Sequence, residues 1–249
     1  MIATPEIIRS TILSRCSELR FGMSTRNGGV SREPFGMNTS FSVGDDHESI
    51  VVNRQRIFDQ LNIAPEEVAI PRQEHTSTIR RVDFPGSYKS CDALITDRRR
   101  LFLHISFADC LPIFLFDPEK RCVGAIHAGW RGSKGLILDK TLDALKSEFG
   151  SIPASIVAFI GPGAGVCCYE VGEEVASEFP EQFVVRNATA KPRLDLKMFN
   201  RDILLRAGVK ERNIEVSPFC TICSPKVFHS YRRDGDQSGR MMALIGLKE

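Results

Sequence analysis

The chain has 249 residues, of which 42% are hydrophobic and 26% are charged, as expected for a globular protein with a substantial core. Its 33 basic and 31 acidic residues nearly cancel, so charge predicts binding neither to nucleic acid nor to a membrane surface. No apolar run approaches the roughly 18 residues of a membrane span, and the first residues lack the pattern of a secretory signal. Eight cysteines in that setting favour reduced thiols. We therefore expect a cytoplasmic protein with a single domain over residues 1–249.

A glycine-rich segment lies near the amino-terminal end. Residues 21–44 hold many glycines and small polar residues, and Asn27-Gly28-Gly29 is a strong turn signal. Such a segment either brings backbone close to a ligand or loops over the surface. Arg26 and Asn38 are its best candidates for substrate binding.

A helix and a short strand follow this segment. Asp45 or Asp46 can cap a helix that runs to about Leu61. The helical period predicts an inward stripe of Ile50, Val51, Arg54, Ile57, Phe58 and Leu61. The strand 68–70 then leads into a polar turn that contains His75, which in isolation would be an ordinary exposed histidine.

Two further reactive side chains stand at the ends of predicted strands. The alternation in 101–107 predicts a strand that ends at Cys110, and 122–126 predicts a second strand that ends at His127, with a turn at 117–120. Residues 91–97 predict another strand before them. A thiolate and an imidazole at one rim can form a nucleophile and base pair, or two ligands of a soft metal.

The carboxyl-terminal half alternates helices and strands. Ser133 is expected to cap a helix that ends near Phe149 and buries Leu136, Ile137, Leu142 and Leu145. A buried strand, 155–160, should precede a glycine-rich loop, which is only a weak signal for anion binding. We also expect helices at 173–179 and 195–207 and a closing strand at 240–247. Arg232 and Arg233 can bind a phosphate bidentately or form surface ion pairs.

Four cysteines in this half are not expected to form a site. Cys167 and Cys168 are adjacent, and on a strand they would point to opposite faces and could not easily bind one ion. Cys220 and Cys223 form a lone Cys-x-x-Cys pair, which is half a zinc site at best.

Together these motifs resemble the laccase-domain family, also called polyphenol-oxidase-like proteins or purine nucleoside phosphorylases of the multicopper-oxidase-like type. The matching pieces span residues 24–240 and are TRNGGVS, MNTSFSVGDD, QEHT, DALIT, ADCLP, HAGWRG, IGPGAG, CYEVG and SYRRDG with SGR. ADCLP and HAGWRG are highly specific together. The glycine usual after the first histidine is Thr76 here, which affects the path of that turn.

The resemblance implies a fold and a set of site residues. The expected fold is α+β, a single-domain four-layer α/β/β/α sandwich with mixed sheets. The family's metal site falls on His75, Cys110 and His127, with zinc as the expected metal and copper a minority option. Arg233 matches a residue expected to help bind substrate or phosphate. These four residues are the predicted catalytic set.

The donor types argue against multicopper chemistry. A trinuclear copper cluster needs about eight histidines beyond a mononuclear centre, and the chain has five in all. Two histidines and one cysteine fill three corners of a zinc tetrahedron and leave the fourth open, the pattern of catalytic zinc. Zinc can lower the pKa of a bound water to roughly 7, which would suit attack on C6 of adenine, or it can orient phosphate at C1′ of a ribose.

The family resemblance therefore predicts phosphorolysis of adenosine, inosine and methylthioadenosine to base and ribose-1-phosphate, with adenosine deaminase as a side activity. The usual deaminase signature is absent, so Asp109 and Glu170 are the candidate general acids or bases. The predicted partners are purine nucleoside and phosphate, and we expect a monomer or weak dimer. Three alternatives stay open: a metal-free Cys–His thiol hydrolase, a copper-dependent polyphenol oxidase, and a non-enzymatic zinc-binding protein with a fourth ligand from Cys91, Cys122 or His229.

Overall fold

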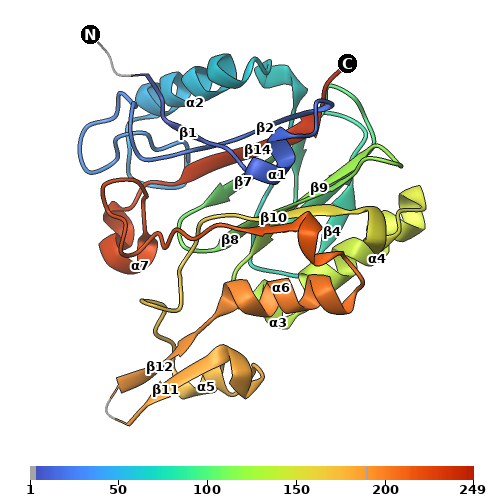
Figure 1. Ribbon diagram of the computed structural model, residues 1–249. Coiled ribbons are helices and arrows are strands. Elements are labelled where there is room, and N and C mark those ends of the chain that lie inside the picture. Colours follow the sequence, from blue (N-terminus) through green and yellow to red (C-terminus); the bar gives the residue numbers. More distant parts are fainter. Residues whose placement is uncertain (1–3, 189) are drawn as a thin grey trace.

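Two six-stranded sheets lie face to face between layers of helices in the computed structural model, which describes residues 4–188 and 190–249 (Figure 1). One sheet has the order β1-β2-β14-β7-β3-β5 and the other β13-β10-β8-β9-β6-β4. Both sheets are mixed, since β14 runs antiparallel to β2 and β7 whereas β3 runs parallel to β7. The predicted four-layer α/β/β/α sandwich is confirmed.

The strands of the first sheet are β1 (Ile7–Ile8), β2 (Leu19–Ser24), β3 (Val68–Pro71), β5 (Gly86–Tyr88), β7 (Phe102–Phe107) and β14 (Met241–Leu247). Those of the second are β4 (Ile79–Arg81), β6 (Ala93–Thr96), β8 (Leu111–Asp117), β9 (Cys122–Ala128), β10 (Val157–Ile160) and β13 (Ile214–Val216). A separate ribbon pairs β11 (Val184–Asn187) with β12 (Ala190–Leu194). The helices are α1 (Thr11–Ser14), α2 (His47–Leu61), α3 (Trp130–Lys134), α4 (Ile137–Phe149), α5 (Glu173–Ala176), α6 (Leu196–Arg206) and α7 (Tyr231–Asp234).

Strand alternation divides the apolar side chains among three interfaces. Along β14, Ala243 and Ile245 face the second sheet, whereas Met242 and Leu244 face α2. The space between the sheets is filled by aliphatic side chains and several phenylalanines, and the rings of Phe21 and Phe114 meet edge to face at 5.0 Å. A third cluster joins the second sheet to α4 and α6. The central strands β8, β9 and β14 are therefore buried on both faces, as their position inside a sandwich requires, whereas the edge strands β4 and β5 are partly exposed.

Helix α2 matches its prediction in bounds but not in every inward residue. The side chain of Asp46 caps it by accepting from the Ser49 N–H, and the helix ends at Leu61. Val51, which was expected to face the core, is 48% exposed. Val51 therefore does not belong to the buried face of this helix, which Ile50, Ile57, Phe58 and Leu61 fill.

The predicted helix after His127 was wrong at its start. Ser133 lies inside the short α3 rather than capping a longer helix, and its side chain accepts from Asn200. Leu136, expected to be buried, has a φ of +58° and is 43% exposed. That left-handed residue breaks the helix in two and turns α4 onto the second sheet (Figure 1).

The stretch between Cys110 and the turn at 117–120 forms a strand, β8, that the sequence interpretation left unassigned. It pairs with β9 from Leu111↔Ala128 to Asp117↔Cys122. The chain thus crosses from the first sheet to the second between Phe107 and Leu111, which places Cys110 at the rim between them. Among the described residues, no helix is long and apolar enough to cross a membrane.

Candidate metal centre

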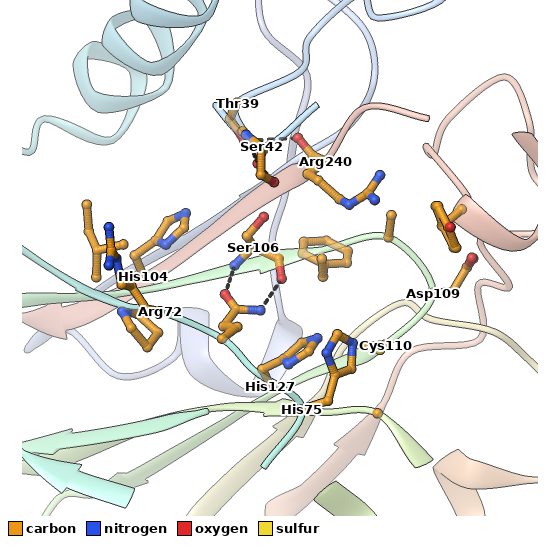
Figure 2. Close-up of a pocket in the computed structure, with 18 of the residues that line it drawn as sticks. Thr39, Ser42, Arg72, His75, His104, Ser106, Asp109, Cys110, His127 and Arg240 are labelled. Atoms are coloured by element: carbon orange, nitrogen blue, oxygen red, sulfur yellow. Dashed lines mark hydrogen bonds between the residues drawn. The ribbon is translucent and has the colours of Figure 1, made fainter. Parts of the chain in front are cut away.

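Three side chains far apart in the sequence meet at one rim of the sandwich. His75 follows β3 in the first sheet, Cys110 lies in the crossing from β7 to β8, and His127 is in β9 of the second sheet. Their ligand atoms all lie within 4.8 Å of one another, and the two imidazole rings are 4.9 Å apart at 75° (Figure 2). The predicted convergence of His75, Cys110 and His127 is present in the structure.

Asp92, immediately before β6, orients two of these ligands. One carboxylate oxygen lies 2.8 Å from Nδ1 of His127, which leaves the other ring nitrogen to face Cys110. The same carboxylate accepts from the backbone N–H groups of Glu74, His75 and Thr76 at 3.1, 3.0 and 2.7 Å. A buried carboxylate behind a ligating histidine is the usual support of a metal site. It also holds His75 in a left-handed conformation, with φ of +59°, that costs energy unless surrounding contacts impose it.

Gly129 leaves the space that the three side chains occupy. A Cβ at this position would lie 2.8 Å from Sγ of Cys110 and 3.4 Å from Cδ2 of His75. The backbone itself is ordinary, with φ of −77°, so the requirement for glycine here is steric.

The electrostatics favour a charged pair at the rim. Burial alone would raise the pKa of Cys110, but the charge and hydrogen bonds of His127 and His75 lower it below the usual range of a thiol. Burial would lower the pKa of His127, and the Cys110 thiolate and Asp92 raise it instead. Asp92 stays ionised, since its bonds to His127 and Thr76 outweigh its desolvation and bring its pKa to about 2.

The donor set fits a zinc ion. Thiolate and imidazole are ligands that zinc prefers, and the thiolate form is already favoured at Cys110. Among the described residues, the metal-type cluster contains these three side chains alone. The predicted candidates for a closing fourth ligand are not in this cluster: Cys122 contacts Ser151, Cys91 contacts the Tyr88 carbonyl, and the ring of His229 lies against Gly239. The arrangement has three protein ligands and room for a non-protein fourth.

The centre opens into a cavity of about 1120 Å³. His75, Cys110 and His127 lie on one side of it, and Ser42 and Arg240 lie across from them in Figure 2. Gln73 is fixed in the wall by a pair of hydrogen bonds with the backbone of Ser106 at 2.7 and 2.8 Å. The aromatic lining residues are Phe41, Phe107, Tyr169 and Tyr231, and the cationic ones are Arg54, Arg72, Arg232 and Arg240.

The structure places Arg233 behind the wall of this cavity rather than in it. Its five N–H donors bond to the carbonyls of Thr221, Ile222 and Phe228 and to both carboxylate oxygens of Asp234. No donor remains for a phosphate. This differs from the expectation of direct binding, and its neighbour Arg232 is the one that lines the cavity.

Arg26 and Asn38 are likewise outside the lining. Arg26 bonds to the carbonyls of Pro34 and Pro225. Asn38 is fully buried, and its side-chain oxygen accepts from the backbone N–H of Arg240 at 2.9 Å. Both residues hold the glycine-rich segment against the carboxyl-terminal part of the chain.

The two residues predicted as general acid or base lie in different hollows. Asp109 lines the cavity beside Cys110, and it accepts from the Thr221 hydroxyl at 2.6 Å and the Arg232 N–H at 2.7 Å. Glu170 lies instead in a smaller neighbouring hollow with Trp130 and Lys191. The geometry therefore favours Asp109 of the two.

Sequence reasoning did not assign roles to Asp92 or Arg240. Asp92 was read only as the acidic start of a strand, although its position before a buried run was a usable signal. Arg240 was read as the first residue of the closing strand, and nothing in its neighbours indicates that it faces a cavity.

Comparison with known proteins identifies the family and agrees with the fold. Residues 20–248 match the family model described as multi-copper polyphenol oxidoreductase laccase. A purine nucleoside phosphorylase, YlmD, from Bacillus subtilis is 36% identical and covers 93% of this chain and 90% of its own. An adenosine deaminase, RL5, from an unknown prokaryotic organism is 33% identical, covering 84% of this chain and 86% of its own. The crystal structure of the hypothetical protein YfiH from Bacillus licheniformis superposes with a TM-score of 0.92 at 34% identity, covering 100% and 98% of the two chains.

The match extends over nearly the whole chain, and the convergence of its three metal-type side chains is what the resemblance predicts. The chain belongs to the multi-copper polyphenol oxidoreductase laccase family.

Proposed function

We propose that this protein is a zinc-dependent purine nucleoside enzyme, built as one domain, that cleaves adenosine, inosine or methylthioadenosine with phosphate and deaminates adenosine as a side activity. One observation carries the proposal: three ligands of catalytic type, His75, Cys110 and His127, lie on one side of a cavity large enough for a nucleoside. Zinc held there would act as a Lewis acid on an oxygen of the substrate, of phosphate or of water.

The lining of the cavity supports a substrate with an aromatic ring and an anionic partner. Phe41 and Tyr231 are exposed aromatic side chains, of a kind on which a purine can stack. Arg54 and Arg240 supply positive charge, and each lies over one of these rings, at 5.3 and 5.2 Å from the centroid of Phe41 and Tyr231. An aromatic ring next to an arginine can bind a purine base by stacking and a phosphate by charge within one cavity.

The named relatives support the same choice of substrate class. One homologue is a purine nucleoside phosphorylase and another an adenosine deaminase, at 36% and 33% identity over most of the chain. Both activities act on a purine nucleoside, and both need a nucleophilic oxygen next to it.

The chain's own residues have separable tasks in this proposal. Asp92 holds His127 in one ring orientation, and Asp109, next to Cys110 in the cavity wall, is the carboxylate placed to exchange a proton with bound substrate. Arg26 and Asn38 position the segment that carries Thr39 to Ser42. Arg233 holds the backbone carbonyls of Thr221, Ile222 and Phe228 and so fixes the chain around Arg232.

The copper alternative has less support. The described residues bring two metal-type clusters together, this one and a group of four cysteines, and neither has the histidines of a trinuclear copper site. A single copper ion bound by His75, Cys110 and His127 would transfer one electron at a time. Such electron transfer does not require a cavity large enough for a nucleoside.

The test is to incubate purified protein with adenosine and phosphate and to follow products by chromatography. Wild type should form adenine and ribose-1-phosphate, with inosine as a minor product, and His75→Ala should form none above blank. Cys16→Ser, which changes a thiol outside the cavity lining, is the control and should keep full activity. Product formation by His75→Ala equal to wild type would overturn the proposal.

A further inference from the structure

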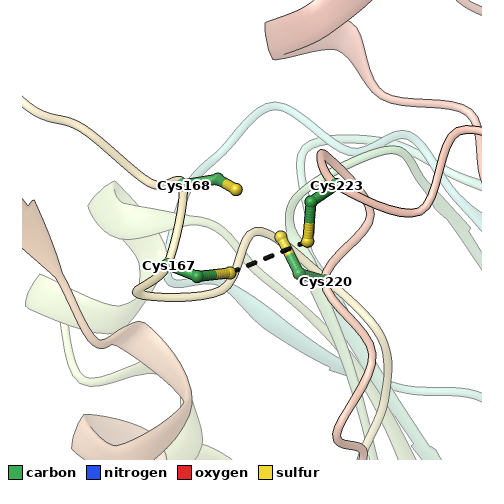
Figure 3. Close-up of side chains that lie close together, drawn as sticks. All are labelled: Cys167, Cys168, Cys220 and Cys223. Atoms are coloured by element: carbon green, nitrogen blue, oxygen red, sulfur yellow. Dashed lines mark hydrogen bonds between the residues drawn. The ribbon is translucent and has the colours of Figure 1, made fainter.

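Four cysteines form a second cluster outside the cavity. Cys167 and Cys168 lie in the turn between β10 and α5, and Cys220 and Cys223 lie between β13 and α7. Their sulfur atoms all lie within 4.8 Å of one another and point inward from two chain segments (Figure 3). The expectation that Cys167 and Cys168 diverge was wrong, because they sit in a turn and not in a strand.

We infer that this cluster is a structural zinc site in which four thiolates complete the coordination. Four sulfurs at the usual zinc–sulfur distance of about 2.3 Å lie about 3.8 Å apart in a tetrahedron. The sulfurs of Cys167 and Cys223 are 3.8 Å apart. The Cys-x-x-Cys pair supplies half of such a site, and the turn at Cys167 and Cys168 supplies the other half.

The surrounding backbone is arranged for a thiolate. The N–H of Gly165 donates to Sγ of Cys220 at 3.2 Å, as amides do around zinc-bound sulfur. A Cβ on Gly165 would come within 3.1 Å of Cys220 Cβ and 3.3 Å of Cys167 Sγ, so glycine also keeps the space between the pairs open.

A buried cation lies nearby. Lys197 is 7% exposed, and its Nζ donates to the carbonyls of Ser217 and Phe219 rather than to a carboxylate. Burial lowers the pKa of this lysine, and the nearby side chains of Cys220, Asp195, Cys167 and Cys223 oppose that shift. A zinc ion with four thiolates has a net charge of about −2, so an adjacent lysine stabilises it.

The site joins the segment that carries Tyr169 to a segment that contacts the cavity residue Asp109. Thr221 donates its backbone N–H to Gly163 at 3.0 Å and its hydroxyl to Asp109 at 2.6 Å. Tyr169, which follows Cys168 directly, lines the cavity. Zinc between the two segments would therefore hold Tyr169 and Asp109 in place without taking part in the reaction.

Three other uses of these thiols are less consistent with the geometry. A disulfide would employ two of the four sulfurs and leave no reason for the other two to converge. Separations under 4.8 Å leave space for one ion and not for an iron–sulfur cluster. A catalytic zinc would need an open position, and here four side chains fill the tetrahedron.

The test uses the full-length His75→Ala/Cys110→Ala variant, in which the cavity centre cannot hold metal. Purified with reductant and without a metal-affinity column, it should contain about one zinc per chain. Exchange with cobalt should give the strong near-ultraviolet sulfur-to-cobalt absorption of a tetrathiolate. Adding Cys16→Ser should leave this absorption unchanged, and adding Cys223→Ser should weaken it.

The exposed position of Cys223 keeps that substitution from disturbing the core, and circular dichroism checks the fold of each variant. The inference is wrong if the folded double variant binds no cobalt, binds it without the sulfur band, or has a Cys167–Cys223 disulfide by mass spectrometry. Because the cavity centre is removed from the experiment, failure of the proposed function leaves this result unaffected.

Discussion

Asp92 sets the geometry of the candidate metal centre although it is not one of the three side chains that could bind the ion. It receives four hydrogen bonds from the turn at residues 74–76 and one contact from Nδ1 of His127. Its carboxylate therefore fixes both the backbone that carries one imidazole and the ring orientation of the other. Supports of this kind are expected to matter for metal affinity almost as much as the ligands.

Asp92→Asn is expected to weaken zinc binding by about 10- to 100-fold, because an amide cannot accept all of these bonds or favour the same tautomer of His127. A competition titration against a chromophoric chelator measures the affinity. Asp143→Asn, an exposed acid in α4, is the control and should bind zinc as wild type does. Wild-type affinity in Asp92→Asn would show that the carboxylate does not orient the site.

Substitution of Gly129 tests the same centre, because an added methyl group would occupy space that the Cys110 and His75 side chains now fill. Gly129→Ala places a methyl group 2.8 Å from the Cys110 sulfur and should abolish stoichiometric metal binding, while its φ of −77° keeps the backbone unstrained. Gly44→Ala meets nothing within 4 Å and serves as the matched glycine control. Elemental analysis reports the metal and thermal unfolding reports the fold. A Gly129→Ala protein with full metal content contradicts the steric reading.

At the scale of elements, α2 covers the first sheet and also binds the glycine-rich segment that precedes it in the sequence. Asn53, fully buried on this helix, accepts from the N–H of Val30 and donates to the carbonyls of Gly36 and Asn38. The glycine-rich segment thus takes its shape from a helix that follows it in the sequence. That segment carries Thr39, Ser40, Phe41 and Ser42, which line the cavity.

Asn53→Ala is expected to lower the free energy of unfolding by about 1–3 kcal/mol, because it removes the hydrogen bonds of a buried amide to the Val30 N–H and to the carbonyls of Gly36 and Asn38. Gln55→Ala, an exposed change on the same helix, should cost under about 0.5 kcal/mol. Urea unfolding followed by circular dichroism compares the two. Equal, small effects would mean that the segment does not depend on α2.

Sequence patterns predicted α2, where periodicity and a cap agree, and also β3 and α6, close to their observed bounds. They failed where tertiary contacts decide. Leu136 looks like a core helical residue, yet it takes a left-handed conformation that lets α4 pack on the second sheet. Cys167 and Cys168 looked unable to share an ion because their turn was not recognised. Strand ends indicated Cys110 and His127, and the family's motifs joined them to His75 as one site. Asp92 was marked only by its position before a buried run, and no local pattern marks Arg240 as a cavity residue.

At the scale of the whole molecule, two histidines are buried without charge. His104 and His229 are 4% and 0% exposed, and desolvation lowers the pKa of both, that of His229 to about 3. In the unfolded chain each titrates near about 6.5. The unfolded state therefore binds more protons than the folded state at pH values between these limits.

The contribution of each histidine to stability should accordingly be full above pH of about 6.5 and fall as the pH drops below it, by up to about 1.4 kcal/mol per pH unit, and for His229 this loss should continue towards pH 3. Urea unfolding between pH 4 and 8 with EDTA in every sample measures this slope. His229→Phe should reduce the slope, and His47→Gln, at an exposed histidine, should not. A slope that His229→Phe leaves unchanged would assign the acid sensitivity to other groups.

The most direct test of the account is an anomalous difference map from crystals measured on both sides of the zinc absorption edge. If these three side chains form a catalytic zinc site, a zinc peak is expected within about 2.0–2.3 Å of the ligand atoms of His75, Cys110 and His127. A non-protein atom should be the fourth ligand, on the side that faces the cavity. A fourth protein side chain on that zinc, or no anomalous density among the three residues, would contradict it.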